Sequence, residues 1–425
     1  MYCLYFVILP AMKTVIKNIK SIVQTEKIQR KWVAGNDMNS INTIEDAFIE
    51  IEDGKILSFG PMDDWQGISD WNNTEIIDAD GGMVFPSYCD SHTHLVFNGS
   101  REEEFNDRIK GLSYQEIANN GGGILNSAKR INEISEDDLF DISSERLKKL
   151  IKLGTGAIEI KSGYGLSVES EIKILNVIKR LKKSSKATIK STFLGLHAVP
   201  SLYLDNKSKY IDLVINEILP EIKKNNLADF IDIFCEKGYF DTDDTKRILI
   251  EGGKIGLQGK THVNQFNSIG GVLASVENNA LSVDHLEVMK EEDYEALKNS
   301  NCMPTILPSC SFFLGIPYGP AKEFIKRGFP VALASDYNPG SSPSGNMNLV
   351  ASLGCIKLKM TSEQVINATT LNTAYAMNLE KEMGSIKVGK KANLFITKPI
   401  ESYKYLHYSF GENLISKVIL NGEII

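Results

Sequence analysis

The 425-residue sequence lacks three features that would assign a protein class at once: a membrane-length apolar run, a paired-cysteine motif and a strongly basic segment. The apolar stretch MYCLYFVILPA at residues 1–11 is shorter than the roughly 20 residues that a spanning helix needs. It has no basic segment before it and no small-residue cleavage site after it. We therefore interpret residues 1–11 as an extension upstream of a start at Met12, and we expect a loosely packed tail.

Charge and cysteine usage exclude several classes of partner. The net charge is -7, and lysines are interleaved with acidic residues, as in EIKILNVIKRLKK, which predicts a solvated helix face and no nucleic-acid surface. The six cysteines show no CxxC spacing, so we expect reduced, mostly buried thiols in a reducing compartment. These features favour a cytoplasmic protein that acts on a small molecule and binds neither nucleic acid nor membrane.

Histidine is also scarce, and its placement is informative. Five of the six histidines follow short apolar or β-branched runs, in the strings SHTH, FLGLHA, GKTHV and SVDHL; they are His92, His94, His197, His262 and His285. The sixth is His407. Histidines that recur at the ends of successive strands predict one site assembled from many strand ends, as at the carboxyl-terminal face of a (β/α)8 barrel.

The middle of the chain has the rhythm of such a barrel. Apolar residues recur at i, i+3, i+4 and i+7 in stretches such as 167–183 and 208–224, which predicts helices. Between the helical stretches we count eight candidate strands, at 83–92, 156–164, 188–198, 230–236, 254–263, 280–286, 302–308 and 330–336. Eight strands alternating with helices over roughly 300 residues predict an α/β fold, the TIM-type (β/α)8 parallel barrel.

The two ends of the chain read instead as β structure. Alternating apolar and polar residues flank Asp53-Gly54 near one end and Asn421-Gly422 near the other, and both dipeptides favour two-residue hairpin turns. We expect the two ends to pair into one small β-sandwich, because chain termini are often close together; the alternative is two unrelated extensions. The predicted domains are a sandwich of 12–84 and 380–425 and a barrel of 85–379.

Polar residues at the predicted strand ends offer a metal site. Asp90, His92 and His94 are spaced two apart, so period-2 alternation would put all three on one face of a strand. With His262 and Asp336 from two other strand ends, three imidazoles and a carboxylate could hold one ion and leave a place for water. Such an ion lowers the pKa of water towards about 7. The alternative is a polar strand end with solvated histidines.

These linked motifs resemble the amidohydrolase superfamily. The resemblance rests on the barrel, the His-x-His after a proline, the strand-five histidine, the strand-eight aspartate and the split β domain. Within the superfamily, the strings HTHLVFNGSR, GGGI, EIKSGYGL, GLHAVP and SDYNPGSSP are similar to the imidazolonepropionase family. Membership would imply hydrolysis of the cyclic amide of 4-imidazolone-5-propanoate to N-formimidoyl-L-glutamate in histidine degradation.

The resemblance also implies roles for individual residues. The family's metal ligands fall on His92, His94, His262 and Asp336, which would bind one divalent or trivalent ion, zinc or iron, per subunit. Its substrate contacts fall on Arg101, Tyr114, Tyr164, His197, Gln265, Asn338, Gly340 and Ser341. Arg101 would bind the propionate, since a guanidinium suits a carboxylate. Without the resemblance to this family, the sequence alone would favour a surface ion pair for Arg101, which stands beside three glutamates, and a loop aromatic residue for Tyr164.

One departure from the family concerns mechanism. Gln265 stands in HVNQF where relatives have an acidic residue, and a neutral amide cannot accept a proton. We expect Gln265 to orient the substrate ring through its amide, and His197, His285 and Asp336 to hydrogen-bond the reacting groups or to move protons. Two further departures, SYCDSH after the strand-one proline and Asn393, concern packing.

Several alternatives stay open on the sequence alone. No lysine at the end of strand four clearly invites carbamylation, since FCEKG offers only Glu236 and Lys237, which favours a single metal. A cytosine- or guanine-type deaminase of the same superfamily is an enzymatic alternative, and a catalytically dead binding barrel is a non-enzymatic one. A homodimer is the default oligomer for such enzymes. Zinc and iron both accept this ligand set.

Overall fold

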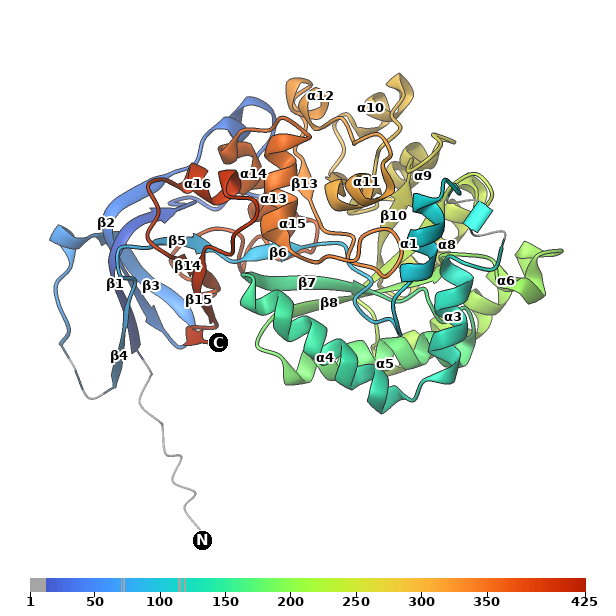
Figure 1. Ribbon diagram of the computed structural model, residues 1–425, viewed down its shortest axis with the longest axis horizontal. Helices are drawn as coiled ribbons and strands as arrows, with labels where there is room; N and C mark the ends of the chain where they lie inside the picture. The colour runs from blue at the N-terminus through green and yellow to red at the C-terminus, as the bar shows by residue number, and fades with distance from the viewer. Residues whose placement is uncertain (1–12, 70, 72, 114–115, 118–119) are drawn as a thin grey trace, which may run out of the picture.

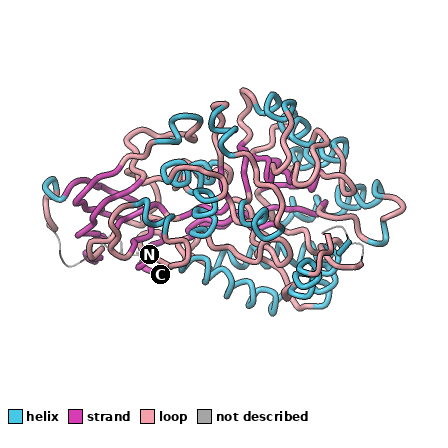
Figure 2. Tube along the Cα trace, turned by 45° about the horizontal axis from the view of Figure 1, so that its top comes forward, coloured by secondary structure: helices cyan, strands magenta, loops and turns pink. Residues whose placement is uncertain are grey.

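The computed structural model describes residues 13–69, 71, 73–113, 116–117 and 120–425. The predicted tail at 1–11 and the predicted substrate contact Tyr114 lie outside the described residues. The described chain forms a parallel barrel and a separate mixed sheet (Figure 1). In Figure 2 the strands accordingly fall into two groups, with most of the helices around the larger one.

The barrel contains eight parallel strands in chain order. They are β6 (Tyr88–Asp90), β7 (Thr155–Lys161), β8 (Thr188–Leu196), β9 (Phe230–Cys235), β10 (Gln258–Val263), β11 (Ser282–His285), β12 (Met303–Ile306) and β13 (Ala332–Leu333). Beyond the last strand the barrel closes through backbone hydrogen bonds, from Asp336 N to His92 O at 3.0 Å and from His94 N to Tyr337 O at 2.8 Å. The predicted (β/α)8 architecture is confirmed, and each predicted strand has its counterpart.

Helices follow the strands and cover the barrel. They are α1 (Glu102–Ile109), α3 (Ile124–Glu133), α4 (Glu136–Lys152), α5 (Val168–Ser184), α6 (Lys207–Leu213), α7 (Leu219–Asn225), α8 (Thr242–Lys254), α9 (Gly271–Glu277), α10 (Glu291–Leu297), α11 (Pro308–Leu314), α12 (Ala321–Lys326), α13 (Met347–Ile356), α14 (Ser362–Thr369) and α15 (Leu371–Tyr375). The predicted helix at 167–183 is α5, whose apolar stripe is buried and whose N-terminus is capped by Ser167.

The predicted helix at 208–224 is not one regular helix. It comprises α6, a π turn at Val214–Ile218 (η4) and α7. Pro220 stands at the start of α7 and has no N–H to donate into the preceding turn. The apolar periodicity correctly predicted the buried face but could not reveal the wider turn, because the buried residues Val214, Ile218 and Ile222 keep a helix-like spacing through it.

The second sheet is built from both ends of the chain, as predicted. It contains β1 (Lys13–Val23), β2 (Thr43–Glu52), β3 (Lys55–Pro61), β4 (Thr74–Asp78), β5 (Met83–Pro86), β14 (Leu394–Thr397), β15 (Ile415–Leu420) and β16 (Glu423–Ile424), accompanied by the short helices η1 (Gly35–Asn39), η2 (Met62–Asp64) and α16 (Tyr403–Tyr408). A further short helix, η3 (Ser201–Tyr203), follows β8 in the barrel. Antiparallel pairing of β14 with β5 joins the two ends.

Local sequence explains the hairpins of this sheet. Asp53 and Gly54 have φ angles of 50° and 74° between β2 and β3, and Asn421 and Gly422 have 52° and 80° between β15 and β16. Two consecutive left-handed residues make the turn that matches strand twist, so both predicted hairpin turns are confirmed. The predicted first barrel strand, 83–92, divides at Ser87 between β5 and β6. The domain limits therefore stay a prediction.

An aromatic cluster lies where the sheet meets the barrel. The ring of Phe395 on β14 stacks on that of Phe85, with centroids 5.0 Å apart, and lies 5.0 Å from the ring of Tyr88 on β6. All three residues are buried.

The five described cysteines carry free thiols. In the described part of the chain, no helix combines the length and the apolar character needed to cross a membrane.

Replacing Phe395 with alanine tests this junction. Removing a fully buried ring leaves a cavity between β5, β6 and β14, and such truncations cost about 3–5 kcal/mol. We expect the urea unfolding midpoint of Phe395→Ala to fall accordingly. Phe410→Ala is the matched control, because Phe410 is 65% exposed and its loss should leave the midpoint unchanged. An equal midpoint in both variants would contradict a shared core at this junction.

Candidate active site and metal centre

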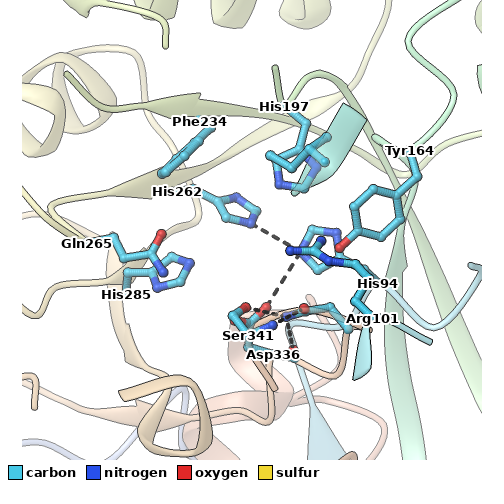
Figure 3. Close-up of a pocket in the computed structure, with 12 residues that line it drawn as sticks. His94, Arg101, Tyr164, His197, Phe234, His262, Gln265, His285, Asp336 and Ser341 are labelled. Carbon is cyan, nitrogen blue, oxygen red and sulfur yellow. Dashed lines mark hydrogen bonds and ion pairs between the residues drawn. The ribbon is translucent and has the colours of Figure 1, made fainter. Parts of the chain in front are cut away.

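Five of the six histidines gather in one place, at the carboxyl ends of the barrel strands. Ring centroids are 4.3 Å apart for His92 and His262, 5.0 Å for His94 and His197, and 5.3 Å for His262 and His285. Figure 3 shows four of these rings around one cavity. The predicted assembly of one site from several strand ends is confirmed by this geometry.

Four buried side chains place their donor atoms close together. Nε2 of His262 lies 3.3 Å from Nε2 of His94. Oδ1 of Asp336 lies 3.5 Å from Nε2 of His92 and 3.6 Å from Nε2 of His94. His92, His94 and His262 each offer a nitrogen within 4.8 Å of the others'. Each of these residues is at most 2% exposed.

The protonation of these rings fits a cation between them. Nδ1 of His92 lies 2.7 Å from Oδ2 of Asp284, and Nδ1 of His262 lies 3.0 Å from Oδ2 of Asp232. A carboxylate beside Nδ1 keeps the proton there, so Nε2 presents a lone pair. Lone pairs from Nε2 atoms and the Asp336 carboxylate then face one another in a buried space. Electron-rich atoms converge in this way when a metal ion neutralises them.

Burial keeps the rings in the form that ligates metals. Loss of solvation, aided by neighbouring positive groups, holds the pKa of His92 and of His94 well below the ordinary value. Both imidazoles are therefore neutral at physiological pH. Three imidazoles and one carboxylate are a donor set that zinc and iron both accept.

Beneath the histidines lies a layer of buried charge that joins several strands. Nζ of Lys161 lies 2.7 Å from Glu159 Oε1 and 2.8 Å from Asp232 Oδ2. Nζ of Lys260 donates to Glu159 and to the carbonyl oxygen of Ser91, the latter at 2.9 Å. Burial opposes ionisation of Asp232, but hydrogen bonds from its neighbours and the charge of Lys161 hold the pKa of Asp232 well below its usual range. Asp284 differs, because burial raises its pKa above the ordinary value although the charges of Lys260 and Lys161 oppose the rise.

The cavity above this layer is lined mostly by polar groups. Its lining comprises His94, Arg101, Ile124, Tyr164, His197, Phe234, His262, Gln265, His285, Asp336, Asn338 and Ser341 (Figure 3). Arg101, just before α1, is 6% exposed, and its Nε donates to Oε2 of Glu104 at 2.9 Å. It is therefore an ion pair, but a buried one inside the cavity wall, and the surface reading of Arg101 is wrong.

The side-chain amide of Asn338 fixes the loop after β13. Asn338 Oδ1 accepts from the backbone N–H groups of Gly340 and Ser341 at 2.8 and 2.7 Å, and its Nδ2 donates to Asp336 O at 2.6 Å. A Cβ on Gly340 would lie 2.1 Å from Cζ of Arg101. Only glycine lets the guanidinium lie this close to the loop backbone.

Tyr164 and His197 form the opposite wall. The tyrosine follows β7 in a loop whose N–H groups at Gly163, Gly165 and Leu166 all donate to the Glu171 carboxylate. Its ring lies 5.4 Å from that of His197. Nδ1 of His197 donates to the carbonyl oxygen of Gly163 at 3.1 Å. Burial lowers the pKa of His197 to about 3, so this ring is neutral.

Comparison with known proteins assigns the family. The amidohydrolase family model matches residues 83–425. The imidazolonepropionase of Flavobacterium johnsoniae is 55% identical over 414 residues, which cover 97% of this chain and 100% of that one. The imidazolonepropionase of Christiangramia forsetii is 54% identical with the same coverage. The chain belongs to the imidazolonepropionase family of amidohydrolases. It is thus a hydrolase of carbon–nitrogen bonds by family, as the sequence motifs predicted.

Solved structures of distant amidohydrolases share the fold. A mutant of atrazine chlorohydrolase from Arthrobacter aurescens, complexed with zinc, superposes with a TM-score of 0.75 at 13% identity, covering 97% of this chain and 94% of that one. Guanine deaminase from C. acetobutylicum gives a TM-score of 0.70 at 16% identity, covering 97% and 100%. These likenesses confirm the barrel with its additional β domain.

One expectation needs correction within this imidazolonepropionase-family site. Asp90 does not share the face of His92 and His94. Its carboxylate accepts instead from Ser335 N at 3.0 Å and Ser335 Oγ at 2.6 Å, because β6 ends at Asp90 and the chain then leaves strand alternation. Burial raises the pKa of Asp90 to about 7. At the end of β9, Glu236 accepts from Phe266 N and Lys237 is exposed, and the single metal stays a prediction.

Sequence reasoning missed the groups that support the histidines. Asp232, Asp284, Glu159, Lys161 and Lys260 are all buried at 1% exposure or less. Three of them, Glu159, Lys161 and Asp232, alternate with apolar residues inside strands, in GAIEIK and FIDIF. A parallel strand with both faces buried should carry few charges, so this alternation was the available signal. Glu287 and Cys310, beside His285, were missed as well.

Alanine substitution of His262 tests the metal centre. Removal of one of four converging donors should strip most of the bound metal from the purified protein, as measured by elemental analysis, while circular dichroism stays unchanged. His407→Ala is the matched control, since His407 is equally buried but lies on α16 of the terminal domain. Full metal content in His262→Ala would remove this histidine from the proposed ligands.

Proposed function

We propose that this protein hydrolyses the cyclic amide of 4-imidazolone-5-propanoate to N-formimidoyl-L-glutamate, with one metal ion held by His92, His94, His262 and Asp336. The observation that carries the proposal is a single buried cavity lined by both the guanidinium of Arg101 and the donor cluster. A compact substrate with a carboxylate at one end and a cyclic amide at the other matches those two features. A cation in this set would polarise the amide carbonyl and lower the pKa of water.

Arg101 is positioned to bind the propionate. Glu104 fixes the guanidinium from Nε, and Glu104 is itself held by Gly123 N at 3.1 Å and Asn126 Nδ2 at 2.9 Å. A guanidinium fixed in this way loses little side-chain entropy when it binds a carboxylate. The loop containing Asn338, Gly340 and Ser341 lies against the same guanidinium and would confine the propionate arm.

His197 has a more specific role than the sequence suggested. Because Nδ1–H is committed to the Gly163 carbonyl and burial keeps the ring neutral, Nε2 carries a lone pair. A lone pair can accept a hydrogen bond from an N–H of the imidazolone ring but cannot donate one to its carbonyl. We therefore propose that His197 orients the ring nitrogen, while Tyr164 packs beside it.

Proton transfer is assigned to His285 and Asp336. Burial lowers the pKa of His285, but Glu287, together with Asp336 and Asp284, outweighs burial and raises this pKa above the ordinary value. An imidazole can accept a proton from water and pass it to the leaving nitrogen. Gln265 lines the cavity and donates from Nε2 to Cys310 Sγ at 3.4 Å. Its amide is proposed to orient the substrate ring.

The proposal has further parts beyond the site. The ion is zinc or iron, since the donors suit both. A reducing, cytoplasmic setting is in keeping with the free thiols of the described cysteines. The enzyme is proposed to act as a homodimer, the commonest symmetric assembly, and to need neither nucleic acid nor membrane.

Purified protein tests the function when metal content and turnover are measured together. We expect imidazolonepropionate to disappear and N-formimidoyl-glutamate to form, with one metal ion per chain. Release of ammonia from cytosine or guanine would instead support a deaminase. A metal-loaded protein that turns over none of these substrates would support the binding-barrel alternative.

Arg101→Met should raise KM for imidazolonepropionate about 30-fold or more. Truncating one partner of a buried charge-assisted pair costs roughly 2–4 kcal/mol. Steady-state kinetics check this, with metal content and thermal unfolding measured alongside. Arg327→Met is the control, because Arg327 pairs with Glu291 and Glu323 outside the cavity. A KM within twofold of the wild type would separate Arg101 from substrate binding.

A further inference from the structure

A buried carboxylate stands directly behind the proposed proton-transfer histidine. Glu287 follows the end of β11 by two residues, and its Oε1 lies 3.5 Å from Nδ1 of His285. The side chains are 1% and 3% exposed. His285 Nδ1 and Glu287 Oε2 have no hydrogen-bond partner among the described residues. Buried polar atoms without a hydrogen bond cost free energy, so the imidazole and the carboxylate are expected to pair with each other. Catalytic hydrogen bonds often shorten only when substrate binds.

The backbone is strained to bring this pair together. His285 and Leu286 have φ angles of 89° and 66°, a region that branched or bulky L-residues rarely occupy. Hydrogen bonds to β10 hold the segment, from Leu286 N to Val263 O at 3.3 Å and from Val288 N to Asn264 O at 2.9 Å. Such strain costs about 1–3 kcal/mol per residue and persists only where the surroundings enforce it.

The helix α11 provides a hydrogen bond that fixes the carboxylate of Glu287. Ser311 on α11 donates from Oγ to Glu287 Oε1 at 3.1 Å, so this oxygen is held by a hydrogen bond from another element. Other polar groups also lie near His285: Asp336 offers a donor atom within 4.8 Å of one of its own, and Gln265 is a neutral amide directed at Cys310. An amide cannot stabilise a positive imidazolium as a carboxylate can. Among the described residues, Glu287 is the carboxylate within ion-pair distance of Nδ1 of His285, at 3.5 Å.

We propose that Glu287 is a positioning residue that holds the proton on Nδ1 of His285 and fixes the ring with Nε2 facing the reacting groups. The inference rests on the proposed function. Water gives a proton to Nε2 as the new carbon–oxygen bond forms. The same proton then passes to the ring nitrogen as the carbon–nitrogen bond breaks, so His285 ends neutral. The Nδ1 proton stays with the histidine throughout, as in carboxylate–histidine pairs generally.

A rival reading of the same atoms is a second cation site. His285, Glu287 and Cys310 each offer a donor atom within 4.8 Å of the others, and all three are buried. Against this, the Cys310 sulfur already accepts a hydrogen bond from Nε2 of Gln265 at 3.4 Å. Metal stoichiometry separates the two readings.

A double-mutant cycle tests the proposal in the metal-loaded full-length protein. Glu287→Gln should lower kcat about 10- to 100-fold, the usual scale for an outer-shell partner, with KM within about twofold and one metal ion retained. His285→Ala should lower kcat about 100-fold or more. Adding Glu287→Gln to His285→Ala should then cost nothing further, because the carboxylate acts only through that ring.

Controls keep the outcomes separate. Glu287→Asp retains the charge and should recover part of the kcat lost in Glu287→Gln. Glu26→Gln removes an equally buried carboxylate that pairs with Lys390 in the terminal domain, and it should leave kcat unchanged. Equal losses of kcat from Glu287→Gln in both backgrounds would overturn the proposal. The proposal would also be overturned if the wild type bound two metal ions and Glu287→Gln bound one, because Glu287 would then be a ligand of a second cation.

A readout without turnover distinguishes failure of this inference from failure of the proposed function. In the zinc-loaded protein labelled with 15N-histidine, NMR should show His285 protonated on Nδ1. The signals of His285 are assigned as those that disappear in His285→Ala. Glu287→Gln should shift that tautomer equilibrium towards Nε2. A wild type that shows the Nδ1 tautomer but no turnover would overturn the activity and leave the carboxylate–histidine pair standing. An unchanged tautomer in Glu287→Gln would overturn the pair itself.

Discussion

The buried charges beneath the histidines constrain everything above them. Glu159 and Lys161 come from β7, Asp232 from β9, Lys260 from β10 and Asp284 from β11. Taking each such ion out of water costs several kcal/mol, and only close opposite charges and hydrogen bonds offset that cost. Here the partners meet only when these strands are in register in one closed barrel. The layer is therefore weak evidence for stability, but it couples closure of the barrel to the arrangement of its mouth.

The same charges set the protonation of the site. Asp284 and Asp232 face Nδ1 of His92 and His262, so both rings direct Nε2 into the cluster. Nζ of Lys161 lies 2.8 Å from Asp232 and 3.8 Å from Asp284, and its charge favours the ionised form of both carboxylates. On the other side of the cavity, the backbone carbonyl of Gly163 does the same for His197. Carboxylates and one carbonyl thus decide what each of these imidazoles can bind.

Much of the fold could be predicted from the sequence, because strand ends, helical periodicity and turn dipeptides are local. The barrel, the joined terminal sheet, both hairpin turns and the gathering of five histidines were predicted correctly. The π turn before Pro220 and the orientation of Asp90 were not, since both depend on hydrogen bonds made elsewhere in the fold. Left-handed φ angles at His285 and Asp336 direct side chains away from strand alternation, which no periodicity reveals.

The supporting charges were harder to predict for a different reason. A lysine or aspartate inside a strand usually marks a solvated face, and only the closed barrel turns that face into a buried interior. Within the imidazolonepropionase family, the ligand positions could be carried over from the strings around His92, His262 and Asp336. The partners of those ligands required the structure, because they come from other strands and share no motif with them.

The most direct test of this account is the metal affinity of Asp284→Asn. The amide keeps the shape of the side chain but removes the charge that holds the proton on Nδ1 of His92. The account predicts a 10- to 100-fold loss of affinity, the usual scale for an outer-shell carboxylate, in a protein that still folds. Asp229→Asn is the control, because Asp229 pairs with Lys182 at the partly exposed amino-terminal end of β9. Equal metal affinity in Asp284→Asn and the wild type would contradict the claim that buried carboxylates set the site.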